Sequence, residues 1–223
     1  MTAYKLIIFD FDGTLADSGP WFMRTLNDVA DRHGFRKVSD EEIEMLRSKS
    51  NREIIRYLGV SFWQLPAIAR DVRKRSAEAA DDIGLFDGIP ELLQALKAGG
   101  LQIAIVTSNG EDTVRRILGP TASLVDHFAC GASLFGKAAK FRSLVRKLQL
   151  QGTEVLAVGD EGRDVEAAHQ VGFSSAAVTW GYATRDALWR CSPTYLVSTV
   201  AELADLHTGS CQGRPDERAM LHS

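Results

Sequence analysis

The sequence has few cysteines, no long apolar run and little net charge, and each of these absences excludes a class of protein. Its cysteines, Cys130, Cys191 and Cys211, are odd in number and widely spaced, so they form no zinc-binding pattern and favour a reducing compartment. No stretch reaches the roughly 18 apolar residues of a membrane span, and the N-terminal segment lacks the basic and apolar parts of a secretory signal peptide. We therefore expect a cytoplasmic protein.

Composition and charge further limit the classes of partner that we expect the protein to bind. The net charge of −3 gives no general attraction to nucleic acid or to an anionic membrane surface. Hydrophobic residues make up 45% and charged residues 25% of the 223 residues, which is the balance of an ordinary globular protein. This length suits one core domain with an insertion. We expect no nucleic-acid partner, no membrane partner, and a monomer or homodimer.

Residues 18–83 are expected to form a helical cap inserted after a first strand at residues 4–9. The inserted segment contains no convincing strand pattern, whereas apolar side chains recur in it at helical spacing. Its expected helices are marked by Trp21–His33, by a capping box at Ser39 to Glu42, by Asn51 as a helix cap, and by Pro66 as a helix start or kink.

The rest of the chain alternates between short apolar strands and helices. This alternation predicts an α/β core with a parallel sheet and helices on both faces, built from residues 1–17 and 84–206. Residues 207–223 are polar and are expected to form a loose tail. The further expected strands are 101–106, 127–130, 155–158, 176–179 and 195–197, and the expected helices begin at Pro90, begin at Lys137, and contain Val165.

Polar side chains follow three of the expected strands, and a lysine lies between the last two sets. These residues are Asp10 and Asp12, then Thr107, Ser108 and Asn109, then Lys137, and finally Asp160, Glu161 and Asp164. Taken alone, each group is as well explained by a turn, a helix cap or a solvated lysine. The carboxyl ends of parallel strands meet at one edge of a sheet, so the joint occurrence predicts a shared phosphate site.

The paired aspartates suit the hydrolysis of a phosphate monoester. Asp10 can attack phosphorus, and Asp12 can protonate the leaving alkoxide and then take a proton from water. A magnesium ion requires oxygen ligands, which Asp10, Asp160 and the backbone carbonyl of Asp12 can supply, while Asp164 can hold a metal-bound water. The sequence therefore predicts Mg²⁺ as cofactor, with Asp10, Asp12, Asp160 and Asp164 as its metal residues.

Neutral and cationic donors complete the predicted site. Lys137 offers a fixed positive charge to Asp10 and to the phosphate, and Thr107 contributes a hydroxyl to catalysis. The residues expected to bind the substrate phosphate are Thr14, Ser108, Asn109 and Lys137.

With these motifs in place, the sequence resembles the haloacid dehalogenase superfamily, in its phosphoglycolate-phosphatase-like branch. The four motifs are Asp10-Phe11-Asp12-Gly13-Thr14, Ile103–Thr107, Phe135-Gly136-Lys137 and Gly159–Asp164, with Lys140 as a weaker alternative for the lysine. The resemblance implies a Rossmann-like core, an inserted helical cap, magnesium dependence and an aspartyl-phosphate intermediate. It also implies a small phosphorylated metabolite as substrate, with phosphoglycolate as the family-level expectation.

Three parts of the sequence leave alternatives open. Glu161 stands where many relatives carry a small polar residue, and it either adds a metal contact or points elsewhere. In the cap, Arg47 and Lys49 lie between two expected helices, where they either bind a carboxylate or second anion of the substrate or belong to a solvated loop. The segment Trp180-Gly181-Tyr182 either walls the site or packs in the core or an interface.

The leading hypothesis is thus a magnesium-dependent phosphatase, with two alternatives of other kinds. The same residues suit a sugar-phosphate mutase if water is excluded and a second hydroxyl attacks the aspartyl-phosphate. A non-enzymatic phospho-acceptor signalling module also combines strand-end acids with a lysine, but it lacks a helical insertion and does not need Asp12. Dehalogenation is disfavoured, because an ester with carbon needs no leaving-group acid such as Asp12.

Overall fold

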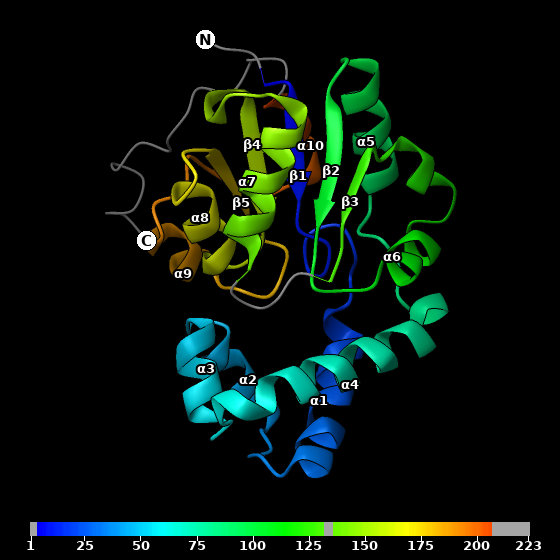
Figure 1. The fold of residues 1–223 in the computed structure, drawn as a ribbon. Coiled ribbons are helices and arrows are strands. Elements are labelled where there is room, and N and C mark those ends of the chain that lie inside the picture. The colour runs from blue at the N-terminus through cyan, green and yellow to red at the C-terminus, as the bar shows by residue number, and fades with distance from the viewer. Residues whose placement is uncertain (1–3, 132–135, 207–223) are drawn as a thin grey trace.

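A computed structural model describes residues 4–131 and 136–206 of the chain. Its centre is a six-stranded, fully parallel sheet with the strand order β3-β2-β1-β4-β5-β6 (Figure 1). The strands are β1 (Leu6–Phe9), β2 (Gln102–Val106), β3 (His127–Ala129), β4 (Val155–Gly159), β5 (Ser174–Val178) and β6 (Tyr195–Val197). The predicted parallel sheet with helices on both faces is confirmed.

The strand β1 lies in the middle of the sheet, between β2 and β4. All of its residues are buried, and Leu6 pairs with Gln102 on one side and with Val155 on the other. A strand buried on both faces needs apolar side chains at successive positions, which the run Leu6–Phe9 provides. The strand order reverses between β1 and β4, and ligands of open α/β sheets bind beyond the carboxyl ends of strands at such a reversal.

Helices cover both faces of the sheet. Alternate strand residues form two apolar clusters, with Ile7 and Phe9 in one and Leu6 and Ile8 in the other. The first face is covered by α5 (Ile89–Ala98), α6 (Glu111–Leu118) and α10 (Val200–Asp205). The second is covered by α7 (Lys137–Leu148) and α8 (Gly162–His169), with α9 (Arg185–Arg190) packed at the β5–β6 side through Leu188.

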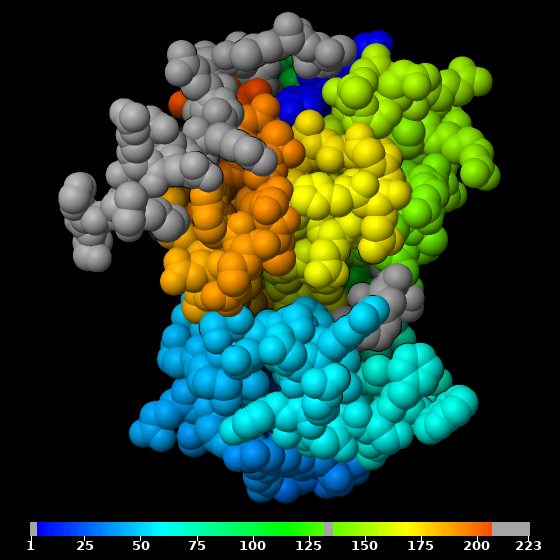
Figure 2. All heavy atoms as spheres, turned by 90° about the vertical axis from the view of Figure 1, so that its left-hand side faces the viewer, coloured from blue at the N-terminus to red at the C-terminus, as the bar shows by residue number. Residues whose placement is uncertain are grey.

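The cap comprises the first four α-helices after β1, and it lies beyond the carboxyl ends of the strands (Figure 1). Its helices are α1 (Gly19–His33), α2 (Asp40–Leu46), α3 (Asn51–Tyr57) and α4 (Leu65–Glu78). Figure 2 shows the cap in blue and cyan, meeting the core below the yellow and orange segments that include α8 and α9. Short 3₁₀ helices occur at Phe62–Gln64, Ala80–Asp82, Gly119–Leu124 and Gly152–Glu154.

The cap has a small apolar cluster of its own. Its buried members are Val38, Leu46 and Leu58. Among the described residues, the exposed large hydrophobic side chains all belong to the cap, and Phe62 and Trp63 are 68% and 88% exposed. The cap is therefore held together by fewer buried side chains than the core, although it is mostly helical.

Most of the expected elements are present, and the exceptions are short or terminal. The helix from Lys137 to Leu148 is confirmed, and the capping box at Ser39 forms at the start of α2. The prediction of Asn51 as a helix cap is wrong: Ser50 caps α3 and Asn51 is its first helical residue. Sequence reasoning missed α6, α9 and α10, and the expected tail at 207–223 lies outside the described residues.

A search of the described helices finds none with the length and apolar character needed to cross a bilayer. The domain boundaries expected at residues 17/18 and 83/84 stay a prediction.

Candidate active site

The first strand delivers Asp10 to the edge of the sheet. The Asp10 backbone N–H donates to the carbonyl of Val158 at 2.8 Å, which extends the pairing of β1 with β4 by one residue. The Asp10 Oδ1 accepts from the Phe11 backbone N–H at 2.7 Å. After Phe11 the chain turns tightly, because the N–H groups of Leu15 and Ala16 both return to the Phe11 carbonyl. This turn keeps the residues after Asp10 close to the same strand end.

Asp160 follows β4 and is fully buried. Its Oδ1 accepts from the Thr14 hydroxyl at 2.9 Å, and its Oδ2 accepts from the Tyr182 backbone N–H at 2.8 Å. Two glycines lie close against this side chain, because a Cβ added at either Gly13 or Gly181 would collide with Asp160. Gly13 also has a φ of +76°, a left-handed conformation that favours glycine. The carboxylate is therefore fixed in orientation by two donors and by the absence of two side chains.

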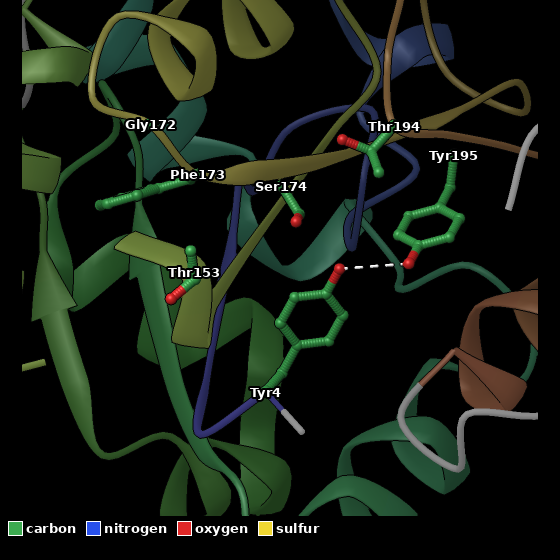
Figure 3. A pocket seen from close by; sticks show the side chains of 7 residues that line it. All are labelled: Tyr4, Thr153, Gly172, Phe173, Ser174, Thr194 and Tyr195. Atoms are coloured by element: carbon green, nitrogen blue, oxygen red, sulfur yellow. Dashed lines mark hydrogen bonds between the residues drawn. The ribbon is translucent and has the colours of Figure 1, made fainter. Parts of the chain in front are cut away.

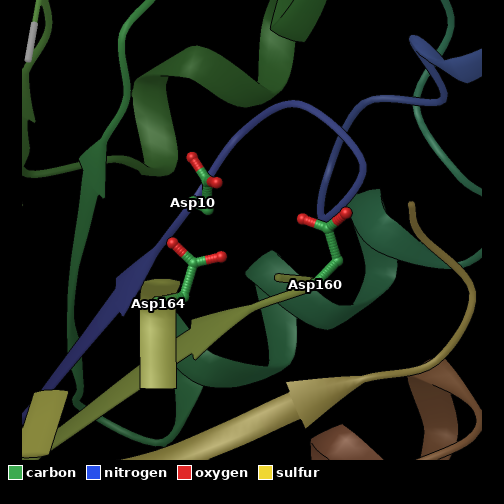
Figure 4. A group of neighbouring side chains, drawn as sticks. All are labelled: Asp10, Asp160 and Asp164. Atoms are coloured by element: carbon green, nitrogen blue, oxygen red, sulfur yellow. The ribbon is translucent and has the colours of Figure 1, made fainter. Parts of the chain in front are cut away.

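Asp164 reaches the same place from the first turn of α8. Its Oδ2 accepts from the Glu161 backbone N–H at 3.1 Å, which fixes the start of the helix. One carboxylate oxygen from each of Asp10, Asp160 and Asp164 lies within 4.8 Å of the others, and all three residues are buried. Figure 4 shows these side chains converging from β1, from the end of β4 and from the start of α8. We call this group the acidic cluster.

The electrostatics of the acidic cluster favour a bound cation. Burial, followed by the neighbouring carboxylates, raises the pKa of Asp160 well above its usual range. Burial also raises the pKa of Asp164 to about 6, against the lowering effect of Lys137. Carboxylates that resist ionisation for these reasons are stabilised by a divalent cation with oxygen ligands. The donor set, which is all oxygen, therefore fits a magnesium site.

Lys137 is the first residue of α7 and is buried against the acidic cluster. Its Nζ lies 2.5 Å from Asp10 Oδ2 and also contacts Asp164 Oδ1. Although burial disfavours the ammonium, the charges of Asp10 and Asp164 outweigh it and raise the Lys137 pKa, so the group stays charged. The alternative lysine, Lys140, is half-buried one turn further along α7. The structure thus brings Lys137 into the site.

Asp12 lies two residues beyond Asp10 and is half-buried. Burial, and then the Asp10 carboxylate, raise the pKa of Asp12 to about 6, while a hydrogen bond from Ser18 lowers it. A carboxyl group with a pKa near the working pH is suited to both donating and accepting a proton. The side chain of Asp12 is not part of the acidic cluster, so the expected contact through its backbone carbonyl remains the way it would join a metal site.

The loop after β2 carries the three polar residues expected near the phosphate. The Thr107 hydroxyl is buried and accepts from the Asn109 backbone N–H at 3.1 Å, and Ser108 is half-buried. The Asn109 side-chain amide donates to the Ser76 hydroxyl of α4 at 3.1 Å. In this structure Asn109 therefore ties the loop to the cap. Similarly, the Thr14 hydroxyl is directed at Asp160, where it orients a candidate metal ligand.

The cap residues Arg47 and Lys49 lie in different surroundings. Arg47 donates from Nε to the Tyr182 carbonyl at 2.9 Å and from Nη2 to the Gly181 carbonyl at 3.4 Å. It also contacts Glu44, whereas Lys49 is exposed. Sequence reasoning left open whether residues 180–182 wall the site or pack in the core or an interface, and it did not identify Arg47 as their partner.

Arg163 is a charged residue of the site that sequence reasoning missed. It forms an ion pair with Glu161, so the Glu161 carboxylate points toward Arg163. Burial lowers the Arg163 pKa, but the charges of Glu161, Asp164 and the other nearby carboxylates together outweigh it and raise the pKa, so this guanidinium remains charged. Arg163 lies within the motif Gly159–Asp164, and this position was the available signal. The spacing of the acids in the motif does not predict the residues between them.

One described cavity lies away from the acidic cluster. It has a volume of about 380 Å³ and is lined by Tyr4, Thr153, Gly172, Phe173, Ser174, Thr194 and Tyr195 (Figure 3). Ser174 and Tyr195 begin β5 and β6, so this cavity is at the amino ends of the strands, opposite the acidic cluster. This cavity is therefore not part of the candidate site, which the converging charged residues place at the opposite end of the sheet.

Known proteins resemble this chain over most of its length. The family model of haloacid dehalogenase-like hydrolases matches residues 7–178. A phosphoglycolate phosphatase of Synechococcus elongatus is 35% identical over 201 residues, covering 89% of this chain and 95% of the relative. The tyrosine-protein kinase PtkA of Mycobacterium tuberculosis is 29% identical, covering 90% of this chain and 72% of that protein. A crystal structure of a predicted phosphoglycolate phosphatase from Haemophilus somnus has a TM-score of 0.73 at 24% identity, covering 92% of this chain and 99% of the other, and supports the fold.

Proposed function

The chain belongs to the haloacid dehalogenase-like hydrolase family, and from this premise we propose that it is a magnesium-dependent phosphatase acting through an aspartyl-phosphate. The observation that carries the proposal is the convergence of Asp10, Asp160 and Asp164 on Lys137, with Asp12 beside them. Buried acids and one buried lysine at a strand end are expensive to hold without a ligand, and a phosphate with its cation uses all of them.

The proposed substrate is a small phosphorylated metabolite of the phosphoglycolate kind. The support is the relative from Synechococcus elongatus, which is named a phosphoglycolate phosphatase and aligns with 89% of this chain. The structure adds that the cap lies beyond the same strand ends as the acidic cluster, a position suited to contact the part of a substrate that is not transferred. The role of Lys49 in binding an anion of the substrate stays a prediction.

The first half of the reaction forms a bond between an Asp10 carboxylate oxygen and phosphorus. The ester bond between phosphorus and the substrate oxygen breaks, and Asp12 gives its proton to that leaving oxygen. Asp12 suits this role because its raised pKa keeps a protonated fraction near neutral pH. The products of this half are the free alcohol and a phosphorylated Asp10.

The second half regenerates the enzyme. A water molecule attacks the phosphorus atom, and the Asp12 carboxylate takes its proton. The bond between phosphorus and the Asp10 oxygen breaks, which restores the Asp10 carboxylate and releases inorganic phosphate. Asp12 ends protonated and ready for the next substrate, so protons balance over the cycle.

The remaining groups bind and neutralise charge. A magnesium ion would be held by Asp10, Asp160, Asp164 and the backbone carbonyl of Asp12. When bound, it supplies positive charge that reduces repulsion between the Asp10 carboxylate and the phosphate. Lys137 adds a second fixed charge beside Asp10, and Thr107 and Ser108 offer donors for phosphate oxygens.

The direct test is phosphate release by the purified protein with Mg²⁺ against a panel of phosphorylated metabolites. We expect turnover of a small phosphomonoester that stops on addition of a chelator and returns with Mg²⁺. A brief reaction quenched in acid should leave one acid-stable, hydroxylamine-sensitive phosphate on the chain. Absence of phosphate release across the panel would contradict the proposal, and release that needs no added divalent cation would contradict its metal requirement.

A further inference from the structure

The loop between β5 and α9 touches the acidic cluster, the neighbourhood of Asp12 and the cap at the same time. Resting on the proposed function, we propose that Tyr182 in this loop is a positioning residue and that Arg47 is the cap side chain that holds it. Docking of the cap then sets the orientation of the metal ligand Asp160 and of the acid–base residue Asp12. Arg47 in this role is a latch between two parts of the protein.

The first link joins the loop to the acidic cluster. The Tyr182 backbone N–H donates to Asp160 Oδ2 at 2.8 Å. Gly181 precedes it, and a Cβ at this position would collide with the side chain of Asp160 and with the Gly13 carbonyl oxygen. The loop therefore presses directly on the carboxylate, and any shift of residues 181–182 changes both the donor and the packing that orient Asp160.

The second link joins the loop to Asp12. The Tyr182 hydroxyl lies 2.8 Å from the Ser18 hydroxyl. Ser18 is 1% exposed, and its hydroxyl also hydrogen-bonds the Asp12 side chain. Ser18 immediately precedes α1, so it marks the point at which the chain leaves the core for the cap. The Tyr182 hydroxyl therefore holds a hydroxyl that interacts with Asp12, at the point where the chain enters the cap.

The third link joins the loop to the cap. Arg47 donates to the carbonyls of Tyr182 and Gly181, and its own carbonyl accepts from the Thr184 backbone N–H at 3.1 Å. The Tyr182 ring packs edge-on against Phe22 of α1, with 6.0 Å between ring centroids. The cap thus contacts this loop through α1 and through Arg47, the residue that follows α2.

These contacts distinguish a latch from a substrate-binding arginine. The Nε and Nη2 donors of Arg47 are directed at backbone carbonyls of the loop. If the cap moved away, these carbonyls would lose both donors. Coupling between two events is reciprocal, so a ligand that orders Asp160 also favours cap docking. The consequence is that metal binding should weaken when Arg47 is removed, although Arg47 contacts none of the three acids.

The deciding experiment measures Mn²⁺ binding in the absence of substrate, from the free-ion signal in electron paramagnetic resonance. We expect Arg47→Ala to weaken Mn²⁺ affinity by about 3- to 10-fold, the loss expected from one or two hydrogen bonds. In phosphate release, kcat should fall by about 10-fold while KM changes by less than about 2-fold. Arg52→Ala, which removes an exposed arginine from α3, is the matched control and should keep the parent affinity.

A direct role of Arg47 in substrate binding gives the opposite pattern. KM would rise with kcat nearly unchanged, and Mn²⁺ affinity would equal that of the parent, which would overturn the latch. The metal measurement does not need turnover. If the parent protein released no phosphate, the proposed function would fail while the comparison of Mn²⁺ affinities would still decide the latch.

The hydroxyl link has its own test. Tyr182→Phe keeps the ring and the backbone N–H, so Mn²⁺ affinity should remain and kcat alone should fall, by about 5-fold. Ser18→Ala should give a similar loss, and the double variant should be no slower than either single one, because the pair acts as one unit. Losses that multiply in the double variant, or parent kcat in Tyr182→Phe, would refute the link to Asp12.

Discussion

The core and the cap are stabilised in different ways. In the core, strands such as β1 are buried on both faces and the acidic cluster is embedded among them. In the cap, a small apolar cluster is supplemented by local hydrogen bonds, with capping boxes at the starts of both α2 and α3. The acidic cluster is thus placed where the backbone is most constrained, whereas the cap relies to a larger extent on local sequence signals.

The largest expected difference in activity between a core variant and a cap variant comes from removing the proposed nucleophile. Asp10→Asn should lower kcat by about 10⁴-fold or more, because the carboxylate proposed to attack phosphorus is lost. The melting temperature should change by only a few degrees. Asp40→Asn makes the same chemical change at an exposed position of α2 and should retain parent activity. Near-normal phosphate release by Asp10→Asn would remove Asp10 from the mechanism.

Asp12→Asn is expected to be the next largest effect. A fixed amide cannot give or take the proton, so both formation and hydrolysis of the aspartyl-phosphate should slow, by about 10²- to 10⁴-fold. Quenched-flow trapping of the phosphorylated chain separates the two halves of the reaction. If the variant hydrolysed its aspartyl-phosphate at the parent rate, the proposed return of the proton to Asp12 would be wrong.

Two glycines allow the core and the cap to be compared with one substitution. Gly13 and Gly59 have φ values of +76° and +68°, so Gly→Ala adds backbone strain of about 1 kcal/mol at either position. Gly59 has open space around it, whereas a Cβ at Gly13 would meet Asp160 and, at 2.8 Å, the Tyr182 ring.

Gly59→Ala should therefore lower stability slightly and leave Mn²⁺ affinity intact. Gly13→Ala should weaken Mn²⁺ binding by about 10-fold or more, since the loss of orienting bonds on Asp160 adds to the strain. Denaturant unfolding and Mn²⁺ titration on both variants give the comparison. Equal metal affinity in the two variants would show that the orientation of Asp160 does not depend on the glycine.

The smallest expected effect is a loss of cap stability at acidic pH. Asp71 of α4 contacts Arg32, His33 and Arg75, and its carboxyl is 9% exposed. Burial opposes ionisation, but the hydrogen bond from His33 and the two arginine charges outweigh it and lower the Asp71 pKa below its ordinary 3.8. The lowered pKa means that the stabilisation is complete above the unfolded-state pKa and is lost as pH falls through the folded-state value.

The measurement for Asp71 is the melting temperature of the parent and of Asp71→Asn as a function of pH. The parent should be more stable by about 2 °C near neutral pH, and the difference should shrink below about pH 4. Hydrogen exchange should assign the loss to α1 and α4, while β1 keeps its protection. A constant difference down to pH 2.5 would mean that the Asp71 charge is not what joins these helices.

The sequence contained enough to predict the sheet and the order of its motifs. Runs such as Leu6–Phe9 leave no polar face, so they are readable as central parallel strands without any knowledge of their neighbours. The helix α6 was missed because its apolar face is short and interrupted by four charged residues in eight. Serine and asparagine cap helices about equally well, so residue type alone does not identify the cap of α3. The pairing of Ser50 with Glu53 was the signal that Ser50 is the cap.

The site was predictable as a set of positions but not as a set of contacts. Strand ends place Asp10 and Asp160 together because the sheet topology does so. The bond from Asn109 to Ser76 and the bonds from Arg47 to residues 181–182 join segments that are distant in sequence. Such contacts depend on rotamers and on how the cap is seated, for which composition and spacing carry no information.

The position of β1 has a consequence for the newly synthesised chain. Leu6 is translated before Val155, its partner on one side, so the central strand remains unpaired on that edge until β4 has been made. The cap, whose contacts are near in sequence, can fold during this interval. On the ribosome, the cap segment is therefore available to fold before Asp160 and Asp164, two acids of the proposed site, have been made.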